Sequence, residues 1–163
     1  MALSLNELFG RAEFLPNSID FAAKRLNFVQ ADRSRIEQLP FIDGREPLGE
    51  PGPSVPLADA LAADWEGPGE PDRFIFHVGF CGSTFLATVL QHAGAFALRE
   101  PHILIDVSDA YEASPTDPAV AQLAYLAADL LRRPWRPDEQ IVCKPSNWCN
   151  RNSRSPNSSY RTV

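Results

Sequence analysis

The chain has 163 residues, which is room for one domain, and 44% of them are hydrophobic and 22% are charged. These are the values of a globular protein. The formal net charge of −6 and the lack of any run of basic residues argue against a nucleic-acid-binding surface. We therefore expect a globular domain without a nucleic-acid partner.

The cysteines and the charge pattern indicate the cellular compartment. Cys81, Cys143 and Cys149 are odd in number and have neither disulfide-framework nor zinc-ligand spacing, which predicts reduced thiols in a cytoplasmic protein and no metal. Charged residues within the first 30 positions argue against a secretory signal. Residues 74–98 carry no charge and are long enough to span a membrane, but their glycines, histidines and changing period argue against a membrane span.

Residues 1–40 predict an N-terminal helical segment. Ser4 and Glu7 form a capping-box pattern, which starts a first short helix. A second helix is expected from about Asn17 or Ser18, and 27–30 reads as an extended piece. The apolar residues of that second helix are Ile19, Phe21, Ala22 and Leu26. A third short helix over 32–39 is stopped by Pro40.

Residues 41–72 are rich in proline and glycine, so they predict a loop with little regular structure. A brief helix is expected around 57–63. This loop would join the N-terminal segment to an α/β core over 73–149.

The stretch 73–100 has the order of a phosphate-binding loop. An apolar run over 74–78 predicts a strand, a glycine-containing turn follows, and apolar residues at helical spacing predict a helix that ends near Gly94. Successive backbone N–H groups and the start of a helix bind anions well. Gly79 and Gly82 permit close approach of the backbone, and the Ser83 and Thr84 hydroxyls can donate to phosphate oxygens.

This loop is not a Walker A loop, because that pattern would need a glycine at His77 and a lysine at Ser83. The stretch FHVGFCGSTFL instead resembles the 5′-phosphosulfate loop of the sulfotransferases. Phe80 stands where that family carries lysine or arginine. The resemblance implies a P-loop NTPase-like parallel sheet with flanking helices and 3′-phosphoadenosine 5′-phosphosulfate as co-substrate. The loop residues that would bind it are Gly79, Phe80, Cys81, Gly82, Ser83 and Thr84.

The rest of the core alternates strands and helices. A short strand is expected over 95–98, a helix after Pro101, a long helix from Asp117 and Pro118 to about 131, and a third strand over 140–144. This order is typical of an α/β fold with right-handed parallel crossovers. About three strands make an incomplete sheet. Residues 150–163 predict a disordered tail, and their abrupt change of character suggests a truncated or frameshifted product.

The resemblance also implies catalytic residues. Glu100 occupies the place of a general base that takes a proton from an acceptor hydroxyl, with His102 as a weaker candidate. Lys144, followed by Pro145, would neutralise charge on the transferring group. The acceptor would be a hydroxyl of a small molecule or a carbohydrate.

Other interpretations stay open. Two purely structural alternatives concern the candidate catalytic residues. Glu100 would be a solvated carboxylate or a partner of Arg99, and Lys144 would be a surface lysine at a strand end. The chain as a whole fits two other classes, a kinase-like phosphotransferase with a degenerate loop or a non-catalytic truncated remnant.

Overall fold

The computed structural model describes residues 3–69, 73–78, 81–147 and 149. It has a mixed α/β architecture, with a three-stranded antiparallel sheet and a two-stranded parallel sheet that contribute to one hydrophobic core. None of the described helices is both long enough and apolar enough to cross a bilayer.

The antiparallel sheet forms where the sequence predicted helix. Strands β1 (Phe14–Asp20) and β2 (Arg25–Ala31) form a hairpin, so the helix expected from about Asn17 is wrong. Its apolar residues fit a helical period, but they lie on both strands and in the turn at 21–24 between them. In that turn the Ala23 N–H donates to Asp20 Oδ1, and Lys24 has a positive φ of 53°. Pairing with a neighbouring strand outweighs the weak local propensity. The extended piece expected over 27–30 lies in β2.

The proline-rich region contains the third strand. Strand β3 (Gly49–Pro56) pairs antiparallel with β2, so the expectation of an irregular loop is wrong for these residues. The sheet order β1-β2-β3 makes β3 an edge strand, which is where proline is tolerated because its missing N–H is not needed on the open side. A β-carbon at Gly52 would lie 2.9 Å from the Phe28 carbonyl oxygen, so glycine permits the close approach of β2 and β3 there.

Three short helices form close to their predicted places. Helix α1 (Leu5–Gly10) starts at the predicted capping box, in which the Glu7 N–H donates to Ser4 Oγ and the Ser4 N–H donates to Glu7 Oε2. Helix α2 (Arg33–Gln38) is capped by the Asp32 carboxylate. Helix α3 (Leu57–Ala62) confirms the brief helix expected after the prolines.

Two of the three predicted parallel strands are confirmed as a two-stranded sheet. Strand β4 (Phe96–Arg99) pairs in parallel with β5 (Ile141–Lys144). On the other side of β5, the Ile75 N–H donates to the Cys143 carbonyl at 2.9 Å, and Phe74 forms a parallel bridge with Cys143. Of the strand expected over 74–78, the structure shows only this short pairing at Phe74 and Ile75. Strand β5 lies between it and β4.

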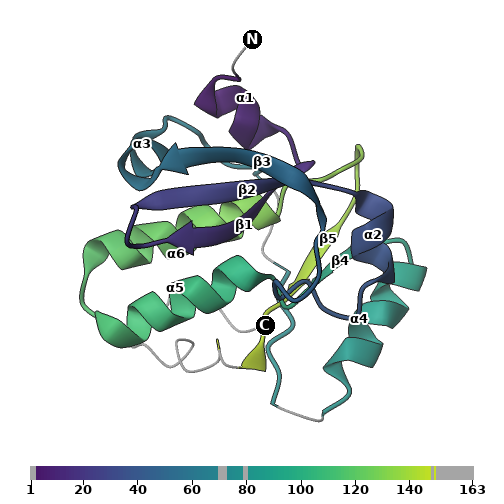
Figure 1. Cartoon of the computed structure of the whole chain (residues 1–163). Helices are drawn as coiled ribbons and strands as arrows, with labels where there is room; N and C mark the ends of the chain where they lie inside the picture. The colour runs from purple at the N-terminus through teal and green to yellow at the C-terminus, as the bar shows by residue number, and fades with distance from the viewer. Residues whose placement is uncertain (1–2, 70–72, 79–80, 148, 150–163) are drawn as a thin grey trace.

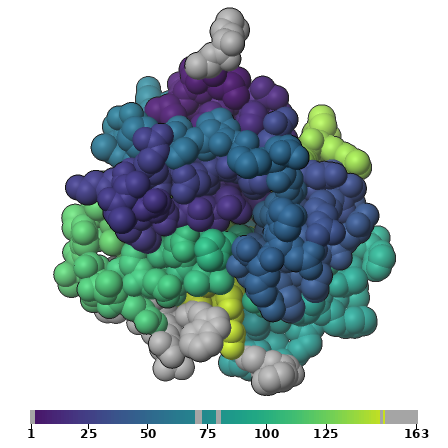
Figure 2. Space-filling view, viewed as in Figure 1, coloured from purple at the N-terminus to yellow at the C-terminus, as the bar shows by residue number. Residues whose placement is uncertain are grey.

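Three longer helices complete the fold. They are α4 (Ser83–His92), α5 (His102–Ala113) and α6 (Pro118–Leu131). Helices α2 and α4 lie on one side of the parallel strands, and α5 and α6 on the other, where both also contact β1 (Figure 1). In the space-filling view the purple surface of the hairpin adjoins the green surface of α5 (Figure 2).

Helix α4 occupies its predicted place, but its apolar residues are largely outside the core. Phe85 is 74% exposed and Leu86 and Val89 are close to half exposed, whereas the small residues Ser83 and Ala87 are buried. Small side chains let the helix approach the sheet closely. The outward face of α4 is consequently apolar.

A buried arginine joins the N-terminal segment to α6. Arg133 is 3% exposed, and its guanidinium donates to backbone carbonyls of α1, of the start of β1 and of α6. The accepting residues are Leu8, Phe9, Arg11, Phe14 and Leu130. Burial lowers the pKa of Arg133 to about 9, which leaves the guanidinium charged at neutral pH.

Arg133→Met keeps the aliphatic stem but leaves these carbonyls without their donor. We expect it to lower the free energy of unfolding by about 3 kcal/mol, because several buried acceptors lose their partner together. Urea unfolding followed by circular dichroism measures this loss. Arg136→Met, at an exposed position, is the control and should change stability by less than about 0.5 kcal/mol; equal losses in the two variants would contradict the role of Arg133.

Candidate functional site

The predicted site residues Glu100 and Lys144 meet at the carboxyl ends of the two parallel strands. Lys144 ends β5, Glu100 directly follows β4, and the Glu100 N–H donates to the Lys144 carbonyl at 2.6 Å. The parallel register aligns Arg99 with Lys144. In open α/β sheets, ligands bind outside the carboxyl ends of the strands, so this is where a site is expected.

Their side chains form a buried ion pair. Lys144 Nζ lies 2.6 Å from Glu100 Oε1, with exposed side-chain fractions of 1% for Lys144 and 18% for Glu100. The ammonium also lies 5.6 Å from the ring centroid of Phe41, which adds a cation–π contact. A surface lysine at a strand end is therefore the wrong description of Lys144, and Glu100 is paired with Lys144 instead of Arg99.

The backbone of Glu100 is in an unusual conformation. Its φ is 57°, a left-handed value that is uncommon for residues other than glycine, asparagine and aspartate. Such strain of about 1–3 kcal/mol persists where the surroundings hold it, and it is found often at functional sites. Here the Lys144 carbonyl and the ion pair hold Glu100 in place.

Arg99 has a structural role. Its guanidinium donates to the carbonyls of Ile36, Glu37 and Leu39, at the end of α2, and burial lowers its pKa. Cations near a helix C-terminus stabilise the unpaired carbonyls. Arg99 thereby fixes β4, and with it Glu100, against α2.

His102 does not join the ion pair. Its Nε2 lies 3.5 Å from Asp106 Oδ1 one turn along α5, and its ring packs against Gly44. Asp106 in turn accepts a hydrogen bond from the Ile19 N–H at 2.7 Å, and burial raises the pKa of its carboxyl. His102 therefore links α5 to the 41–48 loop and to β1, and Glu100 is the better placed of the two predicted bases.

The loop residues lie at the start of α4. Gly82 is the N-cap residue with a φ of 81°, a value that favours glycine, and α4 begins at Ser83. The Leu86 N–H donates to the Gly82 carbonyl, and Thr84 lies in the first turn. Gly79 and Phe80, the first two predicted loop residues, lie outside the described residues.

His77 connects the segment before this loop to the residue that follows Lys144. Its Nε2 lies 3.0 Å from the carbonyl oxygen of Pro145, the residue after Lys144, and its Nδ1 lies 3.2 Å from that of Val78. The segment that enters the loop therefore runs beside the end of β5. The loop entrance and the Glu100–Lys144 pair belong to the same end of the parallel strands.

Two residues of this region were not predicted from the sequence. Phe41 packs under Lys144, and the Arg45 guanidinium lies 5.5 Å from the same ring. Hydrogen bonding to Asp43 raises the pKa of Arg45, and the charge of Glu100 adds a smaller effect in the same direction. The only sequence signal was a cation and an aromatic residue within the proline-rich region, with nothing to connect them to Lys144.

The thiol of Cys81 differs from the other two. Cys81 is exposed, and hydrogen bonds from the backbone N–H and then the hydroxyl of Ser83 lower its pKa. Burial raises the pKa of Cys143 and raises that of Cys149 to about 11. Among the described residues no group of three or more histidine, cysteine or acidic side chains is arranged to hold a metal ion.

Comparisons with known proteins do not assign this site to a family. No protein-family model matches the chain, and searches of curated proteins and of solved structures find no match either. The resemblance to the sulfotransferases therefore rests on the residues of the chain itself.

The difference between the thiols predicts selective alkylation. At neutral pH, iodoacetamide should modify Cys81 at least about tenfold faster than Cys143 or Cys149, because the thiolate is the reactive form. Peptide mass spectrometry over time measures the three rates. Ser83→Ala should slow the reaction of Cys81 without abolishing it, since the backbone hydrogen bond remains. Ser34→Ala on α2 is the control and should leave the rate at Cys81 unchanged. Equal rates at all three cysteines would contradict the lowered pKa of the Cys81 thiol.

The ion pair predicts energetic coupling between its two residues. Lys144→Met should lower the free energy of unfolding by about 3 kcal/mol, because it leaves the Glu100 carboxylate without its partner in a mostly buried place. The double variant Glu100→Gln, Lys144→Met should lose clearly less than the sum of the single losses. Urea unfolding of all four proteins gives the coupling energy. The exposed pair Arg11–Glu13 is the control and should couple by less than about 1 kcal/mol.

Proposed function

We propose that this chain is a sulfotransferase-like protein with a P-loop-type core. It would bind 3′-phosphoadenosine 5′-phosphosulfate at the loop before α4 and transfer the sulfuryl group to a hydroxyl of a small molecule or a carbohydrate. The observation that carries the proposal is the contact between Glu100 and Lys144 at the carboxyl ends of neighbouring parallel strands, with the loop entrance held beside them by His77.

In this proposal the loop holds the phosphosulfate of the donor. The amides at the start of α4 and the hydroxyls of Ser83 and Thr84 would donate to its oxygens, and the helix N-terminus favours the negative charge. Phe80 supplies no cation to the loop. Arg45, whose side chain is 70% exposed and is paired with Asp43, would provide the missing positive charge together with Lys144.

Glu100 would act as the general base. As the acceptor oxygen bonds to sulfur, the bond from sulfur to the donor phosphate oxygen breaks, the acceptor proton passes to the Glu100 carboxylate, and 3′-phosphoadenosine 5′-phosphate leaves. Lys144 fixes the orientation of the Glu100 carboxylate, because its Nζ lies 2.6 Å from Glu100 Oε1. In-line positioning and charge stabilisation are what group transfers of this kind require from a protein.

Binding of 3′-phosphoadenosine 5′-phosphate tests the donor site. Isothermal titration should detect binding by the wild-type chain, and Phe80→Arg should tighten it about tenfold or more because it restores the cation found in the sulfotransferases. Phe85→Arg places the same charge on the exposed face of α4 and is the matched control, with a smaller effect expected.

The outcome separates the alternatives. No heat with the folded wild-type chain and none with Phe80→Arg would remove the proposal. Binding of a nucleoside triphosphate that depends on magnesium would favour a phosphotransferase. Glu100→Gln should keep donor binding but lower the rate of sulfuryl transfer by about 10²- to 10⁴-fold, as expected for loss of general-base catalysis. This result would identify Glu100 as the base.

A further inference from the structure

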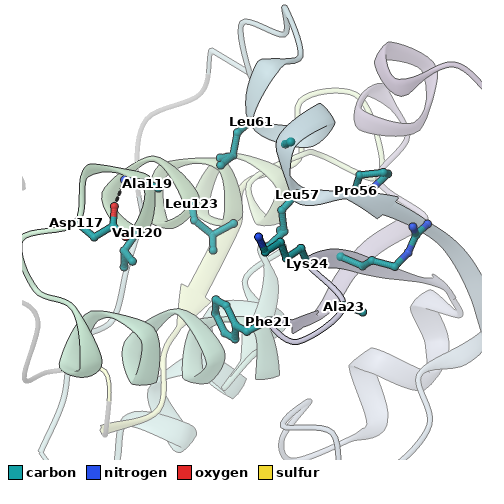
Figure 3. Close-up of a pocket in the computed structure, with 12 residues that line it drawn as sticks. Phe21, Ala23, Lys24, Pro56, Leu57, Leu61, Asp117, Ala119, Val120 and Leu123 are labelled. Carbon is teal, nitrogen blue, oxygen red and sulfur yellow. Dashed lines mark hydrogen bonds between the residues drawn. The ribbon is translucent and has the colours of Figure 1, made fainter.

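A concave site lies where the antiparallel sheet meets α3 and α6. It is a cavity of about 630 Å³, lined by the turn between β1 and β2, by the junction of β3 with α3, and by the first turns of α6 (Figure 3). Small-molecule sites in proteins typically measure about 300–1,000 Å³. None of the loop or ion-pair residues of the proposed donor site lines this cavity, so the two sites are composed of different residues.

The walls of the cavity are apolar. Leu57, Leu61, Val120 and Leu123 come from α3 and α6, and Phe21 forms the side next to the hairpin turn. Phe21 is 45% exposed although the cavity beside it offers an apolar surface. Figure 3 shows Phe21, Leu57 and Leu123 converging on the same space. A ligand with an apolar body would remove this surface from water.

One cation at the cavity is left without a partner. Within the part of the chain that the structure describes, the Lys24 ammonium makes no hydrogen bond or ion pair. The two other charged residues of the lining are already engaged: Arg25 donates to Ser54 Oγ at 2.8 Å, and Asp117 accepts the capping hydrogen bond from Ala119 at 2.9 Å.

The backbone holds Lys24 at the cavity. Its φ of 53° is a left-handed value that costs free energy for lysine, and its carbonyl accepts a hydrogen bond from the Leu57 N–H at 2.9 Å. This bond ties the hairpin turn to the start of α3. Figure 3 shows the Lys24 side chain on the cavity side, above Phe21.

From these observations we infer that the cavity binds a small amphipathic anion, with its apolar body against Phe21, Leu57 and Leu123 and its carboxylate paired with Lys24. A neutral apolar ligand would use the walls but not the cation. A phosphate or another anion without an apolar part would have only one exposed lysine to bind, and it would bind weakly.

Decanoate and decanol serve as probes that differ in the head group. Isothermal titration of the full chain should show binding of decanoate that is about fivefold or more tighter than that of decanol. Lys24→Gln should weaken decanoate about fivefold and leave decanol unchanged. Arg136→Gln removes one positive charge at an exposed position that does not line the cavity, and should leave both affinities unchanged.

A variant that fills the cavity tests the location. Ala119→Trp adds a large side chain at an exposed lining position, so it should abolish binding of both probes while the unfolding temperature stays near that of the wild type. Ala113→Trp, at the end of α5, is the matched control and should bind both. Absence of decanoate binding by the wild type, binding unaffected by Ala119→Trp, or equal effects of Lys24→Gln on both probes would each overturn the inference.

Discussion

The contact on which the proposed chemistry depends is the ion pair between Lys144 and Glu100. Either charge would be costly to bury alone. The Glu100 carboxylate and the Phe41 ring together stabilise the Lys144 ammonium at the end of β5, where its side chain is almost completely buried. A backbone hydrogen bond from the Glu100 N–H to the Lys144 carbonyl joins the same two residues. A change at either residue therefore acts on the sheet and on the candidate site at once.

Two buried arginines join elements that are far apart in the sequence. Arg99 joins β4 to the end of α2, and Arg133 joins α6 to α1 and the start of β1. Both donate mainly to backbone carbonyls at helix ends, which have no partner within their own helix. The N-terminal antiparallel sheet is in this way held against the α/β core, and the cavity beside Lys24 lies where the sheet meets α3 and α6.

The face of α4 that bears Phe85 and Val89 contrasts with these well-packed regions. The helix buries its small residues and exposes its large ones, although its sequence has the apolar spacing of a core helix. Periodicity predicts that a helix has an apolar side, but not that a neighbour covers it. The Phe80 position just before this helix is where the loop departs from the sulfotransferases, so both unusual features belong to one segment of the chain.

By itself the sequence determined the elements whose signals are local: the capping box at Ser4, the helix that begins after Asp117, the helix that follows the glycine turn, and the buried strand that ends at Lys144. These depend on hydrogen bonds and apolar runs within a few residues. Only the tertiary structure decided that 14–31 is a hairpin, that a proline-rich segment is an edge strand, and that Phe41 and Glu100 surround Lys144. The hairpin depends on how its two strands pair across the turn, and the other two outcomes depend on partners far away along the chain. A contact between distant segments leaves no pattern in either segment alone.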